Sequence, residues 1–513
     1  MSEVSAMGDA SFSSETAAAG RGVAFLSLQS VSYNLLILVF YLFIVHLLPQ
    51  SAVGVMFGLQ SVGGLFGAFT SSWVSSTVVR YVAHSLGAGD TLGAGKWYTS
   101  GVLLTLGFSL PAGAILLAST PVLSEALFGS HMWAHVLALY SVDFVLQQLI
   151  PVLNAGLTAR SRFGSLFSVV VLSLLVKLAV GVPLLLMGRG LTSVVYAWIA
   201  ADSLQCLAYF SFNRRLVARG LPSGFVRVLR SFGLPLVLLA GFNAATSNAD
   251  RLAVLKIGGT ASLGVYGSML AAAAASTGVF SSFAGAAYPT FTRLNSRGQL
   301  GAATLTQAVR YYYVVSVPIM ALLAALSPAL IALFLGAPYV SGSPAFMLLV
   351  SSLGVSGLGG LLSNVYYSRG NAGTPVRIQL VAGAVFATGV IPLVYYYGLL
   401  GAAVSYGAAN LVSTLWFAYA LRKQGLLNVS RHFAAKGGAL YLLTFAAGYT
   451  PAYLLSYRLT LLPVYTLLGA GVALAGLKYL GMVSEADAEV AATVFPGKLG
   501  KIAAALIHAV SAS

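Results

Sequence analysis

The sequence predicts an all-α polytopic membrane protein with about fourteen transmembrane helices, forming two pseudo-symmetric six-helix lobes plus two extra C-terminal helices. Three observations predict this fold class. Of the 513 residues, 58% are hydrophobic and only 7% are charged, which excludes a soluble globular protein. Apolar runs long enough to cross a bilayer follow one another along the chain. The chain also repeats itself at an offset of 210 residues.

The repeat appears at three separate places. Ser51–Met56 recurs as Ala261–Tyr266, and Asn154 recurs as Asn364. At the third place, Gly188 and Tyr196 recur as Gly398 and Tyr406. A duplicated helical bundle without a soluble domain indicates a transporter with its site between the two halves. Six helices per copy make the repeat parallel, because both copies then cross the membrane in the same sense.

The predicted helices follow from the apolar runs in order. They are residues 23–48, 52–82, 98–119, 135–158, 164–187, 190–212, 231–255, 262–292, 311–335, 343–368, 376–397, 399–421, 437–456 and 460–481. We therefore divide the chain into a tail, a first lobe, a linker, a second lobe, an appended helix pair and a second tail. These segments are 1–22, 23–212, 213–230, 231–421, 437–481 and 482–513.

Basic residues predict the orientation. With the N-terminus inside, 22 of the 27 basic residues fall in inner segments and 4 in outer ones, while Lys177 lies within a helix. Because inner loops of membrane proteins are rich in Lys and Arg, both termini are expected in the cytoplasm. The same asymmetry explains the +16 net charge through anionic lipid, with no nucleic-acid partner. We expect a multi-pass protein of the cytoplasmic membrane.

Several kinds of site are not expected. Cys206 is the single cysteine and the six histidines are scattered, so no disulfide framework or metal site is predicted. No P-loop is present, which argues against ATP hydrolysis. Outer segments are short, with the largest at 119–134, and Glu125 is their one carboxylate outside the helices. This argues against a membrane glycosyltransferase or polymerase, and no catalytic residue and no cofactor are expected.

Three carboxylates lie in spanning runs, and each belongs to a polar stripe at helical spacing. The stripes are Asp143, Gln147, Pro151 and Asn154; Trp198, Asp202, Gln205 and Tyr209; and Asn243, Ser247 and Asp250. Lipid cannot satisfy such groups, so each stripe is expected to face the protein interior. Lys177 could neutralise Asp143 or Asp202. Such a pair either locks the first lobe structurally or takes part in coupling and substrate binding.

The carboxylates break the repeat, whereas four arginines follow it. The position that matches Asp143 is Leu353, and the one that matches Asp202 is Val412. Arg21 and Arg230 open the first helix of each half, and Arg80 and Arg293 close the second helix. These four are either ordinary positive-inside anchors or a ring at the inner mouth of a cavity. Arginine suits phosphate because its guanidinium makes two parallel charge-assisted bonds.

The chain resembles the oligosaccharide flippases of the multidrug/oligosaccharidyl-lipid/polysaccharide superfamily over roughly residues 20–425. Three groups of stretches carry this resemblance. They are Ala52–Phe57, Val79–Val82 and Gly89–Asp90; Phe232–Pro235 and Asn248–Arg251; and Leu263–Tyr266 and Tyr288–Pro289.

The resemblance implies alternating access by two lobes and a glycan on a polyprenyl (phospho)diphosphate carrier as substrate. The four arginines would then meet the phosphate. The cavity and coupling candidates would be Asp143, Gln147, Lys177, Asp202, Gln205, Asn243, Asp250 and Arg251. The expected partners are a lipid-linked glycan, the bilayer and glycosyltransferases of the same pathway, with sodium or a proton as the coupling ion.

Two alternatives stay open, one within the same superfamily, which has two branches to consider, and one of a different class. One is a sodium- or proton-coupled multidrug exporter of the same superfamily, which commonly has an acidic residue in helix 1 that this chain lacks. The branch that flips lipid-linked peptidoglycan precursors also has fourteen helices and fits the sequence. The second alternative, of a different class, is the membrane glycosyltransferase or polymerase.

Overall fold

The computed structural model describes residues 36–228, 234–276, 278–371 and 373–483. These residues form helices joined by short connections, and no strand occurs among them. Ten of the helices are long and apolar enough to cross a membrane, and a shorter apolar helix spans Leu36–Leu47. The all-α polytopic class is thus confirmed, whereas the count of fourteen spans stays a prediction.

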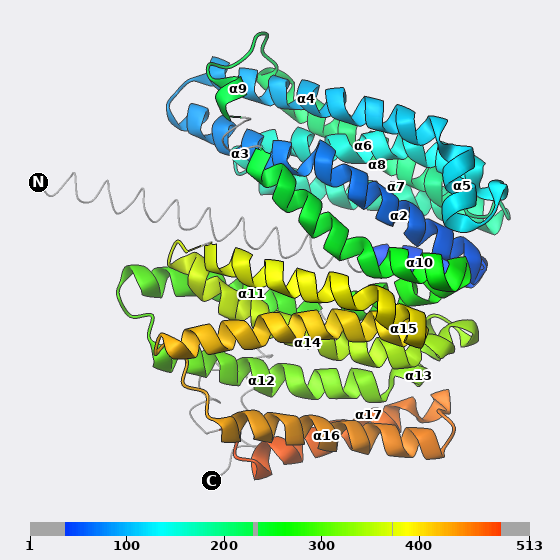
Figure 1. Cartoon of the computed structure of the whole chain (residues 1–513), viewed down its shortest axis with the longest axis vertical. Coiled ribbons are helices and arrows are strands. Elements are labelled where there is room, and N and C mark those ends of the chain that lie inside the picture. Colours follow the sequence, from blue (N-terminus) through cyan, green and yellow to red (C-terminus); the bar gives the residue numbers. More distant parts are fainter. Residues whose placement is uncertain (1–35, 229–233, 277, 372, 484–513) are drawn as a thin grey trace, which may run out of the picture. The chain divides into compact units, whose positions relative to one another are not determined.

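The chain divides into two compact units, one ending at Gly264 and the other beginning at Val265 (Figure 1). After the helix Leu36–Leu47, the helices that begin in the first unit are α2 (Gln50–Thr70), α3 (Ser72–Gly87), α4 (Thr91–Ala118), α5 (Thr120–Phe128), η1 (His131–Trp133), α6 (Ala134–Ala159), α7 (Phe163–Leu186), α8 (Thr192–Asn213), η2 (Arg214–Leu216), α9 (Phe225–Val228) and α10 (Leu234–Ser276).

The second unit continues with α11 (Gly278–Ser296), α12 (Ala302–Ala325), α13 (Ser327–Phe334), η4 (Ala337–Gly342), α14 (Ser343–Ser368), α15 (Gly373–Lys423), α16 (Arg431–Leu454), η5 (Leu459–Leu461) and α17 (Leu462–Tyr479). The tails and Arg21 and Arg230 lie outside the described residues. The domain boundaries predicted from the sequence stay a prediction.

Both units repeat one packing order. In the first unit α6 packs against α3, α4 and α8, and α8 packs against α7. In the second unit α14 packs against α11, α12 and α15. Helices α6 and α14 therefore hold equivalent central places, as the 210-residue repeat predicts. Helices α16 and α17 pack against each other and against α12.

Buried polar groups connect the helices of each unit. In the first unit the Asn213 amide donates to the Leu153 carbonyl over 2.8 Å, and the Ser75 hydroxyl donates to the Pro151 carbonyl over 2.8 Å. In the second, the Asn364 amide donates to the Ala284 carbonyl over 2.8 Å. Lipid gives little hydrophobic driving force between helices, so close packing and such bonds hold the bundles together.

Glycines break the helices at equivalent positions of the repeat. Gly188 follows α7 with φ +74°, and its counterpart Gly398 kinks α15 with φ +56°. Gly259 kinks α10 with φ +80°. Residues with a Cβ rarely adopt this left-handed region, which glycine reaches at low cost. The runs predicted to end near 187, 255 and 397 thus end at glycine turns.

The repeated motif also places two glycines against each other. Gly54 of α2 and Gly264 of α10 are counterparts in Ser51–Met56 and Ala261–Tyr266. A methyl group on Gly54 would overlap the Thr260 carbonyl, and one on Gly264 would overlap the Gln50 carbonyl. The two backbones approach this closely because neither residue has a side chain.

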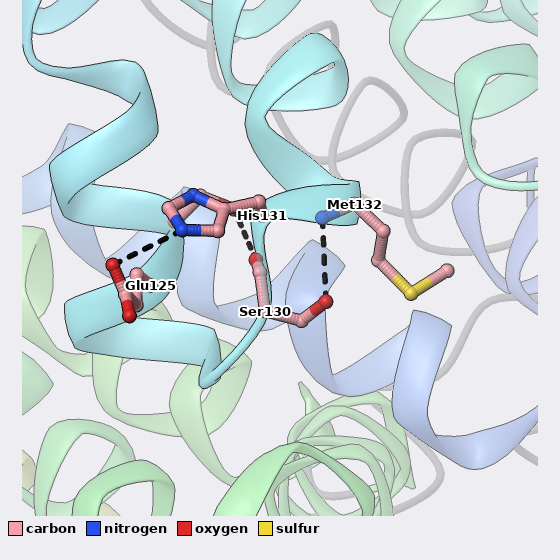
Figure 2. Close-up of polar contacts among 5 residues, drawn as sticks. Glu125, Ser130, His131 and Met132 are labelled. Carbon is pink, nitrogen blue, oxygen red and sulfur yellow. Dashed lines mark hydrogen bonds and ion pairs between the residues drawn. The ribbon is translucent and has the colours of Figure 1, made fainter.

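The segment predicted as an outer loop at 119–134 is largely helical, with α5 and η1 inside it. Pro121 lies in the first turn of α5, and Gly129 ends that helix with φ +68°. The exposed Glu125 carboxylate and the His131 ring lie 3.2 Å apart, and the Met132 amide donates to the Ser130 hydroxyl (Figure 2). The prediction from the sequence missed α5 and η1 because each is shorter than a spanning run.

Candidate functional site

The first unit contains a half-open cavity of about 840 Å³. Its walls come from the helix Leu36–Leu47 and from α2, α6, α7, α8 and α10. The volume lies within the range of roughly 300–1,000 Å³ that is usual for small-molecule sites. Its lining is unusually polar for a bundle of apolar helices, and this makes it the strongest candidate site among the described residues.

Two carboxyl groups lie at the wall between α6 and α8. Asp143 is fully buried and Asp202 is 5% exposed, and only Asp202 lines the cavity itself. Each has a glutamine one turn further along its own helix. Gln147 donates to the Asp143 Oδ2 atom over 2.6 Å, and Gln205 donates to the Asp202 Oδ1 atom over 3.4 Å. Spacings of four and three residues put each donor beside its acceptor.

Lys177 of α7 lines the same cavity. Its charge acts on both carboxyl groups, and Asp202 acts on Asp143. No ion pair closer than 4.0 Å joins Lys177 to either carboxyl in the described part of the chain. The structure therefore places Lys177 beside the acidic pair, where it offsets their charge through space. Two adjacent buried carboxyls are costly when both are ionised, so the pair carries a single negative charge at the lowest cost. One positive charge then balances it.

Carboxamide groups supply much of the remaining polar lining. The lining carboxamides are those of Gln60, Gln147, Gln148, Gln205 and Asn243. The Gln148 Oε1 atom accepts from the hydroxyls of Thr70 and Ser71 over 2.8 and 2.7 Å, which fixes the carboxamide. Gln60 donates to the Tyr41 hydroxyl over 3.4 Å.

The prediction from the sequence included some of this lining and missed the rest. It named Gln147, Lys177, Asp202, Gln205 and Asn243, all of which reach the cavity. It missed the lining residues Tyr41, Gln60, Ser71, Gln148 and Ser173. In the sequence, the position of Gln148 beside Gln147 was the feature that could have indicated its place in the lining. Consecutive helical residues point about 100° apart, so both reach a cavity only when it wraps around the helix.

The third predicted carboxylate lies elsewhere on α10. Asp250 is 1% exposed, and its Oδ1 atom accepts from the Arg251 backbone amide over 2.8 Å. The Arg251 guanidinium lies 5.9 Å from the centre of the Phe57 ring. Neither residue is among the described residues that line the cavity. The structure therefore separates Asp250 and Arg251 from the Asp202–Lys177 wall.

The predicted arginine ring remains a prediction. Arg80 on α3 is exposed, and its guanidinium lies 5.8 Å from the centre of the Tyr81 ring. Arg293, in the last turn of α11, is also exposed. These two belong to different units. In the part of the chain that the structure describes, no cluster of three or more His, Cys, Asp or Glu residues could hold a metal ion.

Comparison with known proteins supports the predicted fold. Residues 95–344 match the family described as polysaccharide biosynthesis protein. No curated protein matches the chain in a sequence comparison. Among solved structures, the lipid II flippase MurJ in an inward closed conformation matches with a TM-score of 0.68 and 17% identity. That match covers 89% of this chain and 98% of MurJ.

Two MATE transporters match less closely. An inward-facing multidrug resistance MATE family transporter of the MOP superfamily has a TM-score of 0.56 and 15% identity, covering 77% of this chain and 94% of that one. The eukaryotic MATE transporter AtDTX14 has the same TM-score and identity, covering 78% and 96%. Residues 95–344 thus match a polysaccharide biosynthesis family, and the chain has the polytopic fold of the multidrug/oligosaccharidyl-lipid/polysaccharide (MOP) superfamily, as the resemblance implied.

Proposed function

We propose that this protein is a transporter that flips a lipid-linked oligosaccharide across the cytoplasmic membrane, for polysaccharide or glycoprotein synthesis. The observation that carries the proposal is the polar cavity inside the first unit. Polar groups within a bilayer are expensive unless they meet a polar partner, so such a cavity suits a hydrophilic cargo. The polysaccharide biosynthesis family match and the likeness to a protein named lipid II flippase favour a glycan as that cargo.

In this proposal the two units alternate between access to the two sides of the membrane. The glycan and its phosphate pass through the protein while the polyprenyl tail stays in lipid. Both termini lie in the cytoplasm, where glycosyltransferases of the same pathway would supply the cargo. No catalytic step is required of this chain.

The proposed phosphate contacts are Arg21, Arg80, Arg230 and Arg293. Each would hold a phosphate oxygen pair through its planar guanidinium. Lysine keeps the charge but loses this geometry. We therefore expect Arg→Ala variants to slow translocation strongly and Arg→Lys variants to slow it less.

The proposed coupling group is the acidic pair of Asp143 and Asp202, with a proton or sodium ion as the driving ion. The pair is buried, it contacts the cavity wall, and Lys177 acts electrostatically on it. Binding of a cation there would change the charge balance at the wall that faces the cargo.

The test is translocation in reconstituted vesicles. A fluorescent polyprenyl-diphosphate tetrasaccharide is incorporated, and its exposure to an external glycosidase is followed over time. We expect exposure to change faster with the protein than in protein-free vesicles, and the eight single Arg→Ala and Arg→Lys variants to be impaired. If all eight fold and translocate normally, these arginines are topological anchors and the phosphate contacts must lie elsewhere.

A multidrug exporter is the second candidate. The fold likeness to MATE transporters favours it. The same vesicles decide between the two. Failure to move the lipid-linked glycan, together with expulsion of ethidium on a sodium or proton gradient, would replace the flippase proposal.

A further inference from the structure

The charged groups that line the cavity balance one another. Among the described lining residues, Lys177 and Asp202 are the charged side chains, one of each sign. Asp143 lies behind this wall and hydrogen-bonds Gln147. Since the adjacent carboxyls together carry a single charge at lowest cost, Lys177 leaves the site close to neutral. A neutral site gives a cationic drug or an anionic phosphate no net attraction.

The uncharged lining is suited to hydroxyl groups. A carboxamide offers both an acceptor oxygen and two donor hydrogens, and a sugar hydroxyl both donates and accepts. The five lining carboxamides therefore match an array of hydroxyls better than they match either ion. The hydroxyls of Tyr41, Ser71, Ser173 and Ser247 extend this array.

Part of the wall is apolar and aromatic. The rings of Phe40, Tyr41 and Trp198 line the cavity, and the last packs edge-on against Tyr140 with ring centres 6.1 Å apart. A pyranose ring presents C–H groups on its faces and hydroxyls at its edge. A site with flat rings and surrounding carboxamides satisfies both surfaces, since aromatic rings supply contact area at low entropic cost.

We propose that the first-unit cavity is a subsite for uncharged sugar residues of the transported glycan, separate from the groups that bind phosphate. This inference rests on the proposed function and names the part of the substrate that this cavity takes. It predicts selectivity for neutral sugars over amino sugars and uronic acids. Gln60, Gln148 and Gln205 would contact hydroxyls, while Lys177 and the acidic pair would set the charge that is accepted.

The experiment measures binding of soluble tetrasaccharides to the purified full chain by calorimetry. The probes share β-1,4 linkages and are built of N-acetylglucosamine, glucosamine or glucuronic acid, so charge is the main difference. The neutral probe should bind best to the unaltered protein. Lys177→Gln should shift the preference toward the cationic probe by about tenfold in Kd ratio. The double variant Asp143→Asn/Asp202→Asn should shift it toward the anionic probe.

Matched controls keep the test specific. Lys256→Gln changes an exposed lysine that lies three residues before the Gly259 kink of α10 and does not line the cavity, and Asp90→Asn keeps a good N-cap on α4, so neither should alter the preference. Gln60→Leu and Gln205→Leu should weaken binding of the neutral probe, whereas the exposed Gln299→Leu should not. Size-exclusion profiles identify any variant that does not fold, and Lys177→Arg then serves as the charge-retaining reference.

Each result decides the proposal. Tighter binding of a charged probe by the unaltered protein, no binding of any probe at millimolar concentration, or charge variants that leave the preference unchanged would overturn it. Translocation of the lipid-linked glycan without neutral-sugar binding here would remove the subsite and leave the flippase. Neutral-sugar binding without translocation would keep the subsite and remove the flippase.

Discussion

At the scale of single residues, the proposed sugar subsite depends on Lys177 and the acidic pair, which set the charge at the cavity wall. Lys177→Ala removes the charge that offsets Asp143 and Asp202, so we expect a loss of about 1–3 kcal/mol in the free energy of unfolding. Adding Asp143→Asn should recover part of that loss, because one of the two carboxyls that Lys177 offsets is then gone. Thermal unfolding in detergent measures both. Lys256→Ala is the control, and strictly additive losses would show that the two residues do not interact.

The sequence predicted the polar cavity residues that lie in stripes and not those outside them. Asp143–Gln147 and Asp202–Gln205 follow helical spacing, so one face of each helix was evident. Gln60 has no polar neighbour one turn away to mark its face. Whether it meets Tyr41 or lipid depends on how α2 packs, and this is a property of the folded bundle.

At the scale of elements, the repeat marks places where backbones turn or touch. Gly188 and Gly398 both adopt positive φ, and Gly54 and Gly264 face each other. The repeat showed that these positions matter but gave no reason for each one. A turn and a close helix contact both require glycine, and only the structure separates the two causes.

The contact between α2 and α10 leads to a second prediction. Gly54→Ala and Gly264→Ala each place a methyl group against a backbone carbonyl, so each should lower the free energy of unfolding by about 1–3 kcal/mol. Gly107→Ala in α4 is the matched control, because no atom outside its chain neighbours and its own helix backbone lies within 4 Å of its added methyl group. Thermal unfolding compares the three. Losses no larger than that of the control would mean that the helices separate there without cost.

At the scale of the whole molecule, charge asymmetry predicts the topology that the transport proposal needs. Composition and apolar runs were sufficient for the polytopic class because a bilayer permits few alternatives to spanning helices. The same reasoning did not predict α5 and η1, since a search for apolar runs of spanning length does not detect elements this short. Orientation depends on the insertion of basic loops and is therefore tested in cells rather than from the fold.

Cysteine labelling provides that test in a Cys206→Ser background, where no other cysteine remains. Ser223→Cys lies between η2 and α9 in the basic segment 213–230, and an impermeant maleimide should label it only after the cells are opened. His131→Cys lies between α5 and α6 in a segment predicted to be outside, so it should react in sealed cells. Because the two sites are separated by three predicted spans, α6, α7 and α8, an odd number of crossings requires opposite results. Labelling of Ser223→Cys in sealed cells would show that the orientation is opposite to the predicted one. The basic segments would then face outward, away from the cytoplasm where the proposed flippase takes up its cargo.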